Sequence, residues 1–253
     1  MCDHLVMRPQ LLTIRFSHYC EKARWALDRA GVAYDEVAYG PGFSSLVALR
    51  QGRSRTVPQL RVPGGATLTE STDILHYADA HGAAPPLFPT GAIAADVVAL
   101  EDELDRKLGP AARRVAYGHL INDPGLPRMV LAAGPAWQQR LPTVVGRGVV
   151  GLIRRGLKID AAGVARSQAA LDALFDTLDA RLADGRPFLC GDTFTAADLT
   201  LAALAAPLVL APGYLRWTTG IDATAPALVA AAAAVRARPT GALAYRLYEE
   251  FRA

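Results

Sequence analysis

Four consecutive residues, Ser17-His18-Tyr19-Cys20, stand at the predicted start of a helix. The first helical turn has free backbone N–H groups and a positive dipole end, which favour an anion such as a thiolate. The hydroxyl of Ser17 would donate a hydrogen bond to a bound thiolate and lower the pKa of that thiol. Alternatively, Cys20 is itself the reactive thiol, with a pKa lowered by its position in the first turn. The simplest structural alternative is that Ser17 caps the helix and Cys20 packs beneath it.

A second candidate feature is the dipeptide Val57-Pro58, directly before a predicted strand. Such an X-Pro bond is able to adopt the cis form, which exposes the preceding backbone to a ligand. The N–H and C=O groups of Val57 would then pair with a peptide-like molecule in the manner of an added strand. The alternative is an ordinary trans proline at the start of a strand.

The pair Glu70-Ser71 lies at a predicted junction between a strand and a helix. Ser71 and the N-terminal amides of the helix suit a carboxylate, and Glu70 suits an ammonium group. Together they fit an amino-acid head group, which carries both charges. The alternative is a capping arrangement with no ligand.

A further motif, at residues 191–198, predicts structure without chemistry. Thr195 as N-cap and Asp198 as the third helical residue form a variant capping box, and Phe194 and Leu199 are placed for a hydrophobic staple. We therefore expect this motif to fix the start of a helix and to take no part in catalysis.

The first 83 residues alternate predicted strands with predicted helices. Strands are predicted at 11–16, 33–39, 59–62 and 66–69, and helices at 20–30, 43–50 and 71–81. A right-handed crossover makes the first two strands parallel, and the turn at 63–65 makes the last two an antiparallel hairpin. The order β-α-β-α-β-β-α matches the thioredoxin-like fold.

The remainder of the chain is predicted to be all helical. Of 48 alanines, 11 precede residue 91 and 37 follow it, and alanine is the strongest helix former. Apolar residues recur at helical spacing over 93–108 and 171–182, and the helix over 195–210 is apolar almost all round, which predicts a central position. The uncharged, proline-rich segment 83–89 indicates a joint, so we predict domains at 1–83 and 91–253 with a linker at 84–90.

Composition excludes several function classes. The balance of 27 basic and 24 acidic residues is too even for a dedicated nucleic-acid binder, and three cysteines do not make a disulfide framework. His76 and His81 are five residues apart, which is poor metal spacing, so no metal is expected. With no secretory pattern and no apolar run of about 18 residues, the expected location is the cytoplasm.

The segment 124–159 contains no acidic residue and combines arginines with valines, leucines and isoleucines. A basic, apolar stretch of this kind is able to contact a membrane surface or an anionic partner. The favoured, simpler interpretation is a pair of helices whose arginines are solvated.

Taken together, these motifs and their order resemble the cytosolic glutathione transferase superfamily, in particular its serine-type members. The resemblance rests on SHYCEKARWAL at 17–27, TVPQL at 56–60, LTESTDILHYA at 68–78 and FLCGDTFTAADLTLAAL at 188–204. It covers nearly the whole chain, and residues 110–165 are the least similar. It implies a thioredoxin-like domain that binds glutathione and a helical domain that shapes the site for a second substrate.

The resemblance also implies roles for individual residues. Ser17 would stabilise the glutathione thiolate. Val57, before the cis-proline position Pro58, would pair with the cysteinyl part of glutathione, and Glu70 with Ser71 would hold the γ-glutamyl end. The glycyl carboxylate has three candidate partners, namely Arg50, Arg53 and Arg55.

Two positions depart from the serine-type pattern. Glu21 stands where arginine is usual, and its charge would oppose thiolate formation unless the side chain points away. Tyr19 stands where proline is usual and is either a second hydroxyl donor or a packing residue. The stretch around 120–160 looks longer than in compact members, so it is a candidate to cover or extend the site for the second substrate.

The resemblance implies a detoxifying transferase that activates the glutathione thiol for attack on a small apolar electrophile, and it implies a homodimer. One alternative is a glutathione-dependent thiol-disulfide reductase that uses Cys20 as nucleophile. Another is a carrier or regulatory binding protein with the same fold and no turnover.

Overall fold

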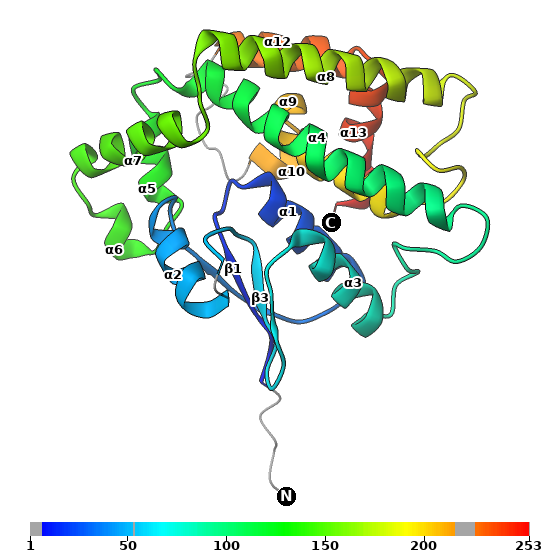
Figure 1. The fold of residues 1–253 in the computed structure, drawn as a ribbon, viewed down its shortest axis with the longest axis horizontal. Coiled ribbons are helices and arrows are strands. Elements are labelled where there is room, and N and C mark those ends of the chain that lie inside the picture. The colour runs from blue at the N-terminus through cyan, green and yellow to red at the C-terminus, as the bar shows by residue number, and fades with distance from the viewer. Residues whose placement is uncertain (1–6, 53, 216–225, 253) are drawn as a thin grey trace, which may run out of the picture.

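The N-terminal part of the protein is built on a small mixed sheet. The computed structural model describes residues 7–52, 54–215 and 226–252 (Figure 1). The sheet runs in the order β2-β1-β3-β4, with strands β1 (Gln10–Thr13), β2 (Asp35–Ala38), β3 (Gln59–Arg61) and β4 (Thr67–Leu68). β1 and β2 pair parallel, whereas β3 pairs antiparallel with both β1 and β4. The predicted parallel pair and the final hairpin are therefore confirmed.

Three helices accompany the sheet, namely α1 (His18–Ala30), α2 (Phe43–Gly52) and α3 (Ser71–His81). α1 begins two residues earlier than predicted, because Ser17 in extended conformation is its N-cap. It ends at Gly31, whose left-handed φ of 71° places its N–H on the last carbonyls of the helix. α1 packs against α3 on one side and against the C-terminal helices on the other, so it links the two halves of the molecule.

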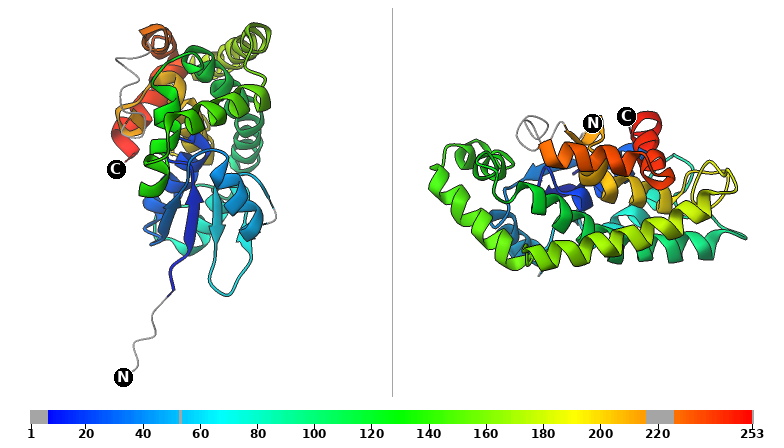
Figure 2. Two further views of the ribbon diagram at one scale, coloured as in Figure 1. Left: turned by 90° about the vertical axis from the view of Figure 1, so that its left-hand side faces the viewer. Right: turned by 90° about the horizontal axis from the view of Figure 1, so that it is seen from above.

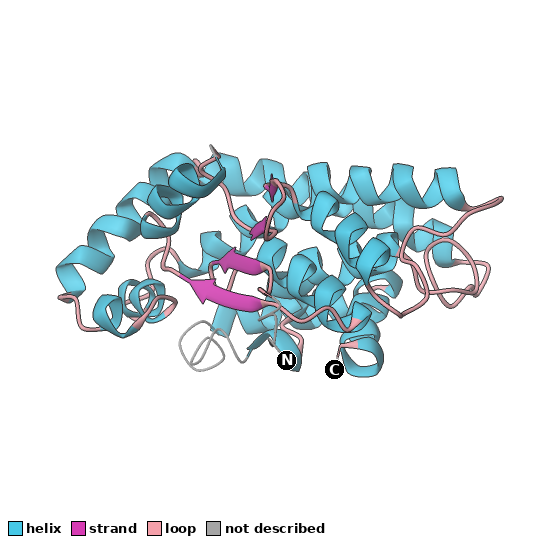
Figure 3. Ribbon diagram, turned by 90° about the horizontal axis from the view of Figure 1, so that it is seen from below, coloured by secondary structure: helices cyan, strands magenta, loops and turns pink. Residues whose placement is uncertain are grey.

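In its described residues the C-terminal part consists of helices joined by loops, with one isolated β-bridge between Phe188 and Gly191, and Figure 3 shows the strands of the sheet grouped together among the helices. Its helices are α4 (Ala94–Leu120), α5 (Leu126–Ala132), α6 (Ala136–Gln139), α7 (Thr143–Gly156), α8 (Ala161–Leu182), α9 (Ala196–Val209), α10 (Pro212–Leu215), α12 (Pro226–Arg236) and α13 (Pro239–Phe251). Every residue of α9 is buried, and α9 packs against α1, α4, α12 and α13. The predicted central helix is confirmed.

The start of α9 is fixed by the predicted capping box. The Asp198 carboxylate accepts hydrogen bonds from the backbone N–H of Thr195 at 2.9 Å and from its hydroxyl at 2.8 Å. It also accepts one from the N–H of Leu189 at 2.7 Å, which ties the preceding loop to the helix. Burial raises the pKa of Asp198 and these hydrogen bonds oppose that shift, so the carboxylate is held in place by its donors.

Two apolar cores hold the molecule together. The main core joins the two parts of the chain, since Leu11 and Trp25 belong to the same cluster as Leu104 and Leu199. A second, smaller core lies around Phe16 and contains Leu120, Leu126, Val130, Leu210 and Leu228. The N-terminal half and the helices are therefore packed as one body, whereas the boundaries 83 and 91 stay a prediction.

The segment 124–159 forms α5, α6 and α7 instead of the predicted pair of helices (Figure 2). The Gly134-Pro135 break and Pro142 divide it into shorter pieces. Its arginines are exposed, as the simpler interpretation expects: Arg128, Arg140, Arg147, Arg154 and Arg155. Among the described residues, no helix is both long and apolar enough to cross a membrane.

Candidate active site

Ser17 lies where the loop after β1 turns into α1. Its Oγ accepts a hydrogen bond from the backbone N–H of Cys20 at 3.4 Å, and no described residue accepts the proton of its own hydroxyl, so that proton is available to a ligand. The side chain is half-buried and faces a cavity of about 370 Å³. The helix terminus and the Ser17 hydroxyl together form a place for an anion at the cavity wall.

The cavity lies between the two parts of the chain. The N-terminal part supplies Ser17 and His18 at the start of α1, and Arg55, Thr56 and Val57 before β3. The helical part supplies walls that are mostly apolar, which include Leu120, Met129, Leu152, Ile153, Leu210 and Tyr214. The site therefore has a polar end next to α1 and an apolar end next to the second core.

The Val57–Pro58 peptide bond is cis, as predicted. Val57 lines the same cavity as Ser17, whereas Pro58 is buried beside the sheet. Within the part of the chain that the structure describes, the backbone N–H and C=O groups of Val57 make no hydrogen bond. They are available to pair with the backbone of a peptide-like ligand.

Glu70 and Ser71 lie at the start of α3 and outside the cavity lining. Glu70 makes no capping hydrogen bond to its own helix, which disfavours the purely structural alternative. Partial burial raises the pKa of Glu70, and the nearby Asp105 and Asp73 carboxylates raise it further. Ser71 is buried and its hydroxyl donates to Asp105 Oδ1 at 3.4 Å. The Glu70-Ser71 pair therefore lies next to the carboxylate of Asp105, which belongs to α4.

A buried ionic cluster, Lys22–Glu101–Asp105–Thr72, joins α1, α3 and α4 behind this pair. Lys22 is fully buried, and its Nζ lies 2.5 Å from both a Glu101 and an Asp105 carboxylate oxygen. Thr72 donates to Glu101 at 2.8 Å and accepts from Lys22 at 3.3 Å. Sequence reasoning missed this cluster, because each member reads as an ordinary polar residue on its own helix.

Tyr19 is directed to α4 and not to the cavity. Its hydroxyl donates to the backbone oxygen of Asp105 at 2.8 Å, and burial together with Asp105 raises the pKa of the phenol. A Cβ at Gly109 would collide with this hydroxyl, so glycine permits the close approach of α1 and α4. Because the single hydroxyl proton of Tyr19 is used in this hydrogen bond, the structure favours the packing alternative over a second donor to the thiolate.

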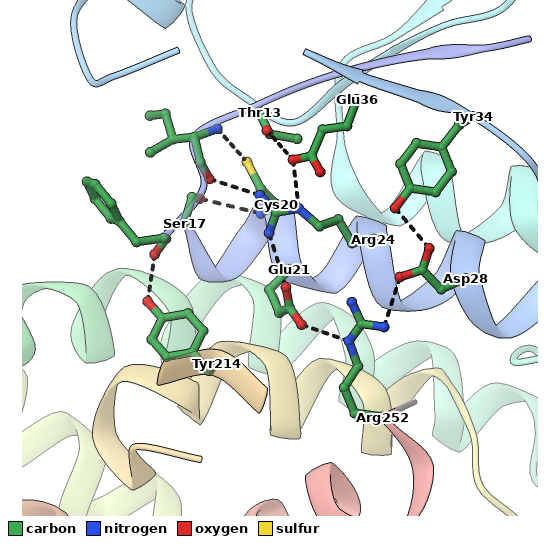
Figure 4. A network of polar contacts seen from close by, with 12 residues as sticks. Thr13, Ser17, Cys20, Glu21, Arg24, Asp28, Tyr34, Glu36, Tyr214 and Arg252 are labelled. Atoms are coloured by element: carbon green, nitrogen blue, oxygen red, sulfur yellow. Dashed lines mark hydrogen bonds and ion pairs between the residues drawn. The ribbon is translucent and has the colours of Figure 1, made fainter. Parts of the chain in front are cut away.

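Cys20 is fully buried, and its Sγ accepts the backbone N–H of Ile14 at 3.4 Å (Figure 4). Burial raises the pKa of the Cys20 thiol, which is opposite to the direction expected from its position in the first helical turn. The helix terminus favours the thiolate, but desolvation is the larger effect for a thiol with no access to water. The structure therefore disfavours the mixed-disulfide mechanism that needs an accessible Cys20 thiolate.

We expect Cys20 to resist thiol reagents. In a Cys2→Ser/Cys190→Ser variant, where Cys20 is the sole thiol, labelling with a dithiobis-nitrobenzoate reagent at pH 8 should be at least roughly 100-fold slower in the native protein than in urea. The release of the coloured leaving group measures both rates. Rapid, stoichiometric labelling of the native protein would restore Cys20 as a candidate nucleophile.

Glu21 does not oppose an anion at Ser17, because its carboxylate is directed to two arginines (Figure 4). Arg24 lies 3.1 Å from one Glu21 oxygen, and Arg252, near the C-terminal end, lies 2.8 Å from the other. The buried charge is therefore compensated within the fold. The Glu21 side chain thus points away from Ser17, and its charge is compatible with a thiolate there.

His18 forms part of the cavity wall and also contacts α4. Its Nε2 lies 3.0 Å from the Gly109 carbonyl, which only accepts hydrogen bonds, so Nε2 carries the proton. Burial, aided by the charge of Arg113, lowers the pKa of His18 to about 3. His18 is therefore neutral at physiological pH. Among residues 7–52, 54–215 and 226–252, no three His, Cys, Asp or Glu side chains are grouped to hold a metal ion.

Two family models match this chain. Residues 11–106 match the N-terminal domain of glutathione S-transferase, and residues 161–238 match its C-terminal domain. The chain belongs to the glutathione S-transferase superfamily. The predicted thioredoxin-like domain followed by an all-helical domain is thereby confirmed. A comparison with curated proteins finds no match.

Solved glutathione S-transferase structures share the fold at low sequence identity. One from Methylobacterium radiotolerans, in complex with glutathione sulfonate, is 22% identical over 93% of each chain, with a TM-score of 0.53. Glutathione S-transferase-I bound with lactoylglutathione is 21% identical over 95% of this chain and 99% of its own, with a TM-score of 0.57. Glutathione transferase F2 from Populus trichocarpa is 17% identical over 96% and 93%, with a TM-score of 0.61.

Within this glutathione S-transferase fold, the three arginines predicted for a glycyl carboxylate lie in different places. Arg55 lines the cavity next to Thr56 and Val57. Arg50 is exposed near the end of α2 and is not part of the lining, and Arg53 lies outside the described residues. Of the two described candidates, Arg55 is the one positioned at the cavity.

The least family-like stretch contributes directly to the cavity. α7 supplies Leu152 and Ile153, and α5 supplies Met129. Gln138 of α6 accepts the N–H of Gly40 at 2.8 Å, which joins this segment to the loop before α2. The segment therefore lines the cavity, and its role toward a second substrate stays a prediction.

Proposed function

We propose that the protein is a glutathione transferase in which Ser17 stabilises the glutathione thiolate. The observation that carries the proposal is the position of Ser17, at the N-terminus of α1 and on the wall of the cavity, with a hydroxyl proton that no described residue accepts. The glutathione thiol loses its proton to water, and the Ser17 hydroxyl and the helix terminus stabilise the resulting anion. The sulfur then attacks an electrophilic carbon, a C–S bond forms, and the leaving group departs with the bonding electron pair.

The peptide part of glutathione is proposed to extend along the N-terminal part of the site. The free backbone groups of Val57 pair with the cysteinyl residue, and Arg55 pairs with the glycyl carboxylate. Glu70 and Ser71 hold the γ-glutamyl end at the start of α3. This placement is supported by the geometry around Val57 and by the two solved relatives that contain glutathione sulfonate and lactoylglutathione.

The apolar end of the cavity is proposed to hold the second substrate, a small apolar electrophile. Its walls come from the second core and from α7, and burial of apolar surface against them drives binding. A detoxifying role, a cytoplasmic location and a homodimer are proposed on the family resemblance alone.

Replacing Ser17 with alanine should lower kcat/KM for conjugation of glutathione to 1-chloro-2,4-dinitrobenzene by about 10- to 100-fold, the value of one hydrogen bond to a charged group. The loss of the donor raises the pKa of the bound thiol, so the activity profile should move to higher pH by about one unit. Ser17→Thr keeps a hydroxyl and should stay within a few-fold of the wild type. The absorbance of the conjugate, recorded from pH 5.5 to 9, checks both effects.

Two results would count against this proposal. A Ser17→Ala variant with full activity and an unchanged pH profile would show that another group stabilises the thiolate. Calorimetric binding of glutathione without product from a panel of electrophiles would favour the non-catalytic carrier.

A further inference from the structure

Arg113 of α4 places a positive charge on the wall of the cavity. The side chain is half-buried, and among the described residues it makes neither a hydrogen bond nor an ion pair. Its neighbour Arg114 is different, since it donates to the Leu157 carbonyl at 2.9 Å and to the Ser167 hydroxyl at 2.7 Å. Arg114 therefore has a structural role, whereas Arg113 has none that these contacts explain.

Tyr117 lies one helical turn after Arg113, on the same face of α4, and lines the same cavity. Its hydroxyl makes no hydrogen bond to the part of the chain that the structure describes. Burial raises the pKa of the phenol to about 12, so the group is a protonated donor at neutral pH. The guanidinium of Arg113 and the phenol of Tyr117 thus lie next to each other. Both are hydrogen-bond donors, and neither has an acceptor among the described residues.

The surroundings make this pair of donors unusual. No described residue of the cavity lining is acidic, and Ala116 and Leu120 continue the same helix face as apolar wall. A cation at an apolar wall costs free energy unless an opposite charge pairs with it. Arg55, the other arginine of the lining, lies before β3 and is already assigned to glutathione in the proposed function.

We propose that Arg113 and Tyr117 form a carboxylate-binding subsite, so that the second substrate is an apolar electrophile that carries a carboxylate. The planar guanidinium of Arg113 and the phenolic hydroxyl of Tyr117 together match the two oxygens of a carboxylate. The apolar body of the substrate fills the region toward Leu152 and Leu210. The conjugation of such a substrate rests on the proposed function. The binding of its carboxylate does not.

Binding is tested with two unreactive ligands that share the same ring, 3,5-dinitrobenzoate, which is charged, and its methyl ester, which is neutral. By calorimetry, the wild type should bind the acid at least about 10-fold more tightly than the ester. Arg113→Gln should abolish this preference and leave ester binding unchanged, Arg113→Lys should keep part of it, and Tyr117→Phe should reduce it by about 3-fold. Arg114→Gln, the matched control outside the lining, should keep the wild-type ratio.

Equal binding of acid and ester by the wild type would overturn the subsite without recourse to any variant. So would an Arg113→Gln variant that keeps the preference for the acid.

Conjugation is measured separately with 4-chloro-3,5-dinitrobenzoate and its methyl ester. In both, the glutathione sulfur bonds to the ring carbon, chloride leaves with the bonding electrons, and the thiol proton passes to water. Selective binding of the acid with no conjugate from either compound would uphold the subsite and contradict the proposed function. Conjugation of both compounds without selective binding of the acid would uphold the proposed function and overturn the subsite.

Discussion

Replacing Lys22 with methionine should lower the free energy of unfolding by about 3–5 kcal/mol. Methionine has a similar length, so the packing volume is nearly kept while the charge is lost. Glu101, with a side chain only 3% exposed, would then keep a buried negative charge with Thr72 as its remaining partner. Urea denaturation followed by circular dichroism at pH 7 measures the change.

Two further variants make this prediction specific. In Lys22→Met/Glu101→Met, most of the lost stability should return, because an apolar pair replaces a buried ion pair at little net cost. Lys107→Met removes an exposed lysine of α4 that pairs with Glu103 at 2.6 Å, and it should cost less than about 1 kcal/mol. A double variant as unstable as the single one would contradict the view that the unpaired Glu101 charge causes the loss.

Lowering the pH should remove stability that depends on a neutral His18. The pKa of His18 is about 3 in the folded protein, whereas the ordinary value is 6.5. Because the pKa of His18 is lower in the folded protein than in the unfolded chain, the neutral imidazole stabilises the fold. This stabilisation is complete above pH 6.5 and is lost as the pH falls toward 3. Between pH 7 and pH 5 this loss amounts to about 2 kcal/mol, at 1.4 kcal/mol per unit below the unfolded pKa.

The contribution of His18 is isolated by comparison with His18→Gln, whose amide is able to donate to the Gly109 carbonyl but does not titrate. Urea denaturation at pH 7, 6 and 5 should show the stability difference between wild type and variant shrink by about 2 kcal/mol. His119→Gln, which changes an exposed histidine of α4, is the control for the loss of a histidine away from the cavity. Parallel curves for wild type and His18→Gln would mean that His18 titrates normally in the folded protein.

The features that the sequence predicts well are those set by local residues. Ser17 and Gly31 bound α1, and Thr195 with Asp198 begins α9, because caps act within one turn of the helix. The hairpin of β3 and β4 follows from the turn between them, and the parallel pair follows from the crossover rule. The family resemblance added the roles expected for Ser17, Val57, Glu70 and Ser71.

The features that the sequence does not predict depend on which helices face one another. Lys22 and Asp105 are 83 positions apart, and nothing in either neighbourhood indicates that they meet. Cys20 and Tyr19 illustrate the same limit: the position in a first turn is visible in the sequence, but full burial and the hydrogen bond to α4 are not. Arg113 belongs to no motif, and only the structure separates it, on the cavity wall, from Arg114, which is hydrogen-bonded to Leu157 and Ser167.

The division of the apolar residues into two cores has a consequence for how this protein is able to change over evolution. The main core, the capping box of α9 and the Lys22 cluster hold the fold, and none of them uses the side chains of α7. α7 has a single buried residue, Gly146, yet Leu152 and Ile153 shape the apolar wall of the cavity. Val149, Val150 and Ile153 of α7 pack against the second core and not against the main one. We therefore expect substitutions in α7 to alter which molecules fit the cavity while the main core stays intact.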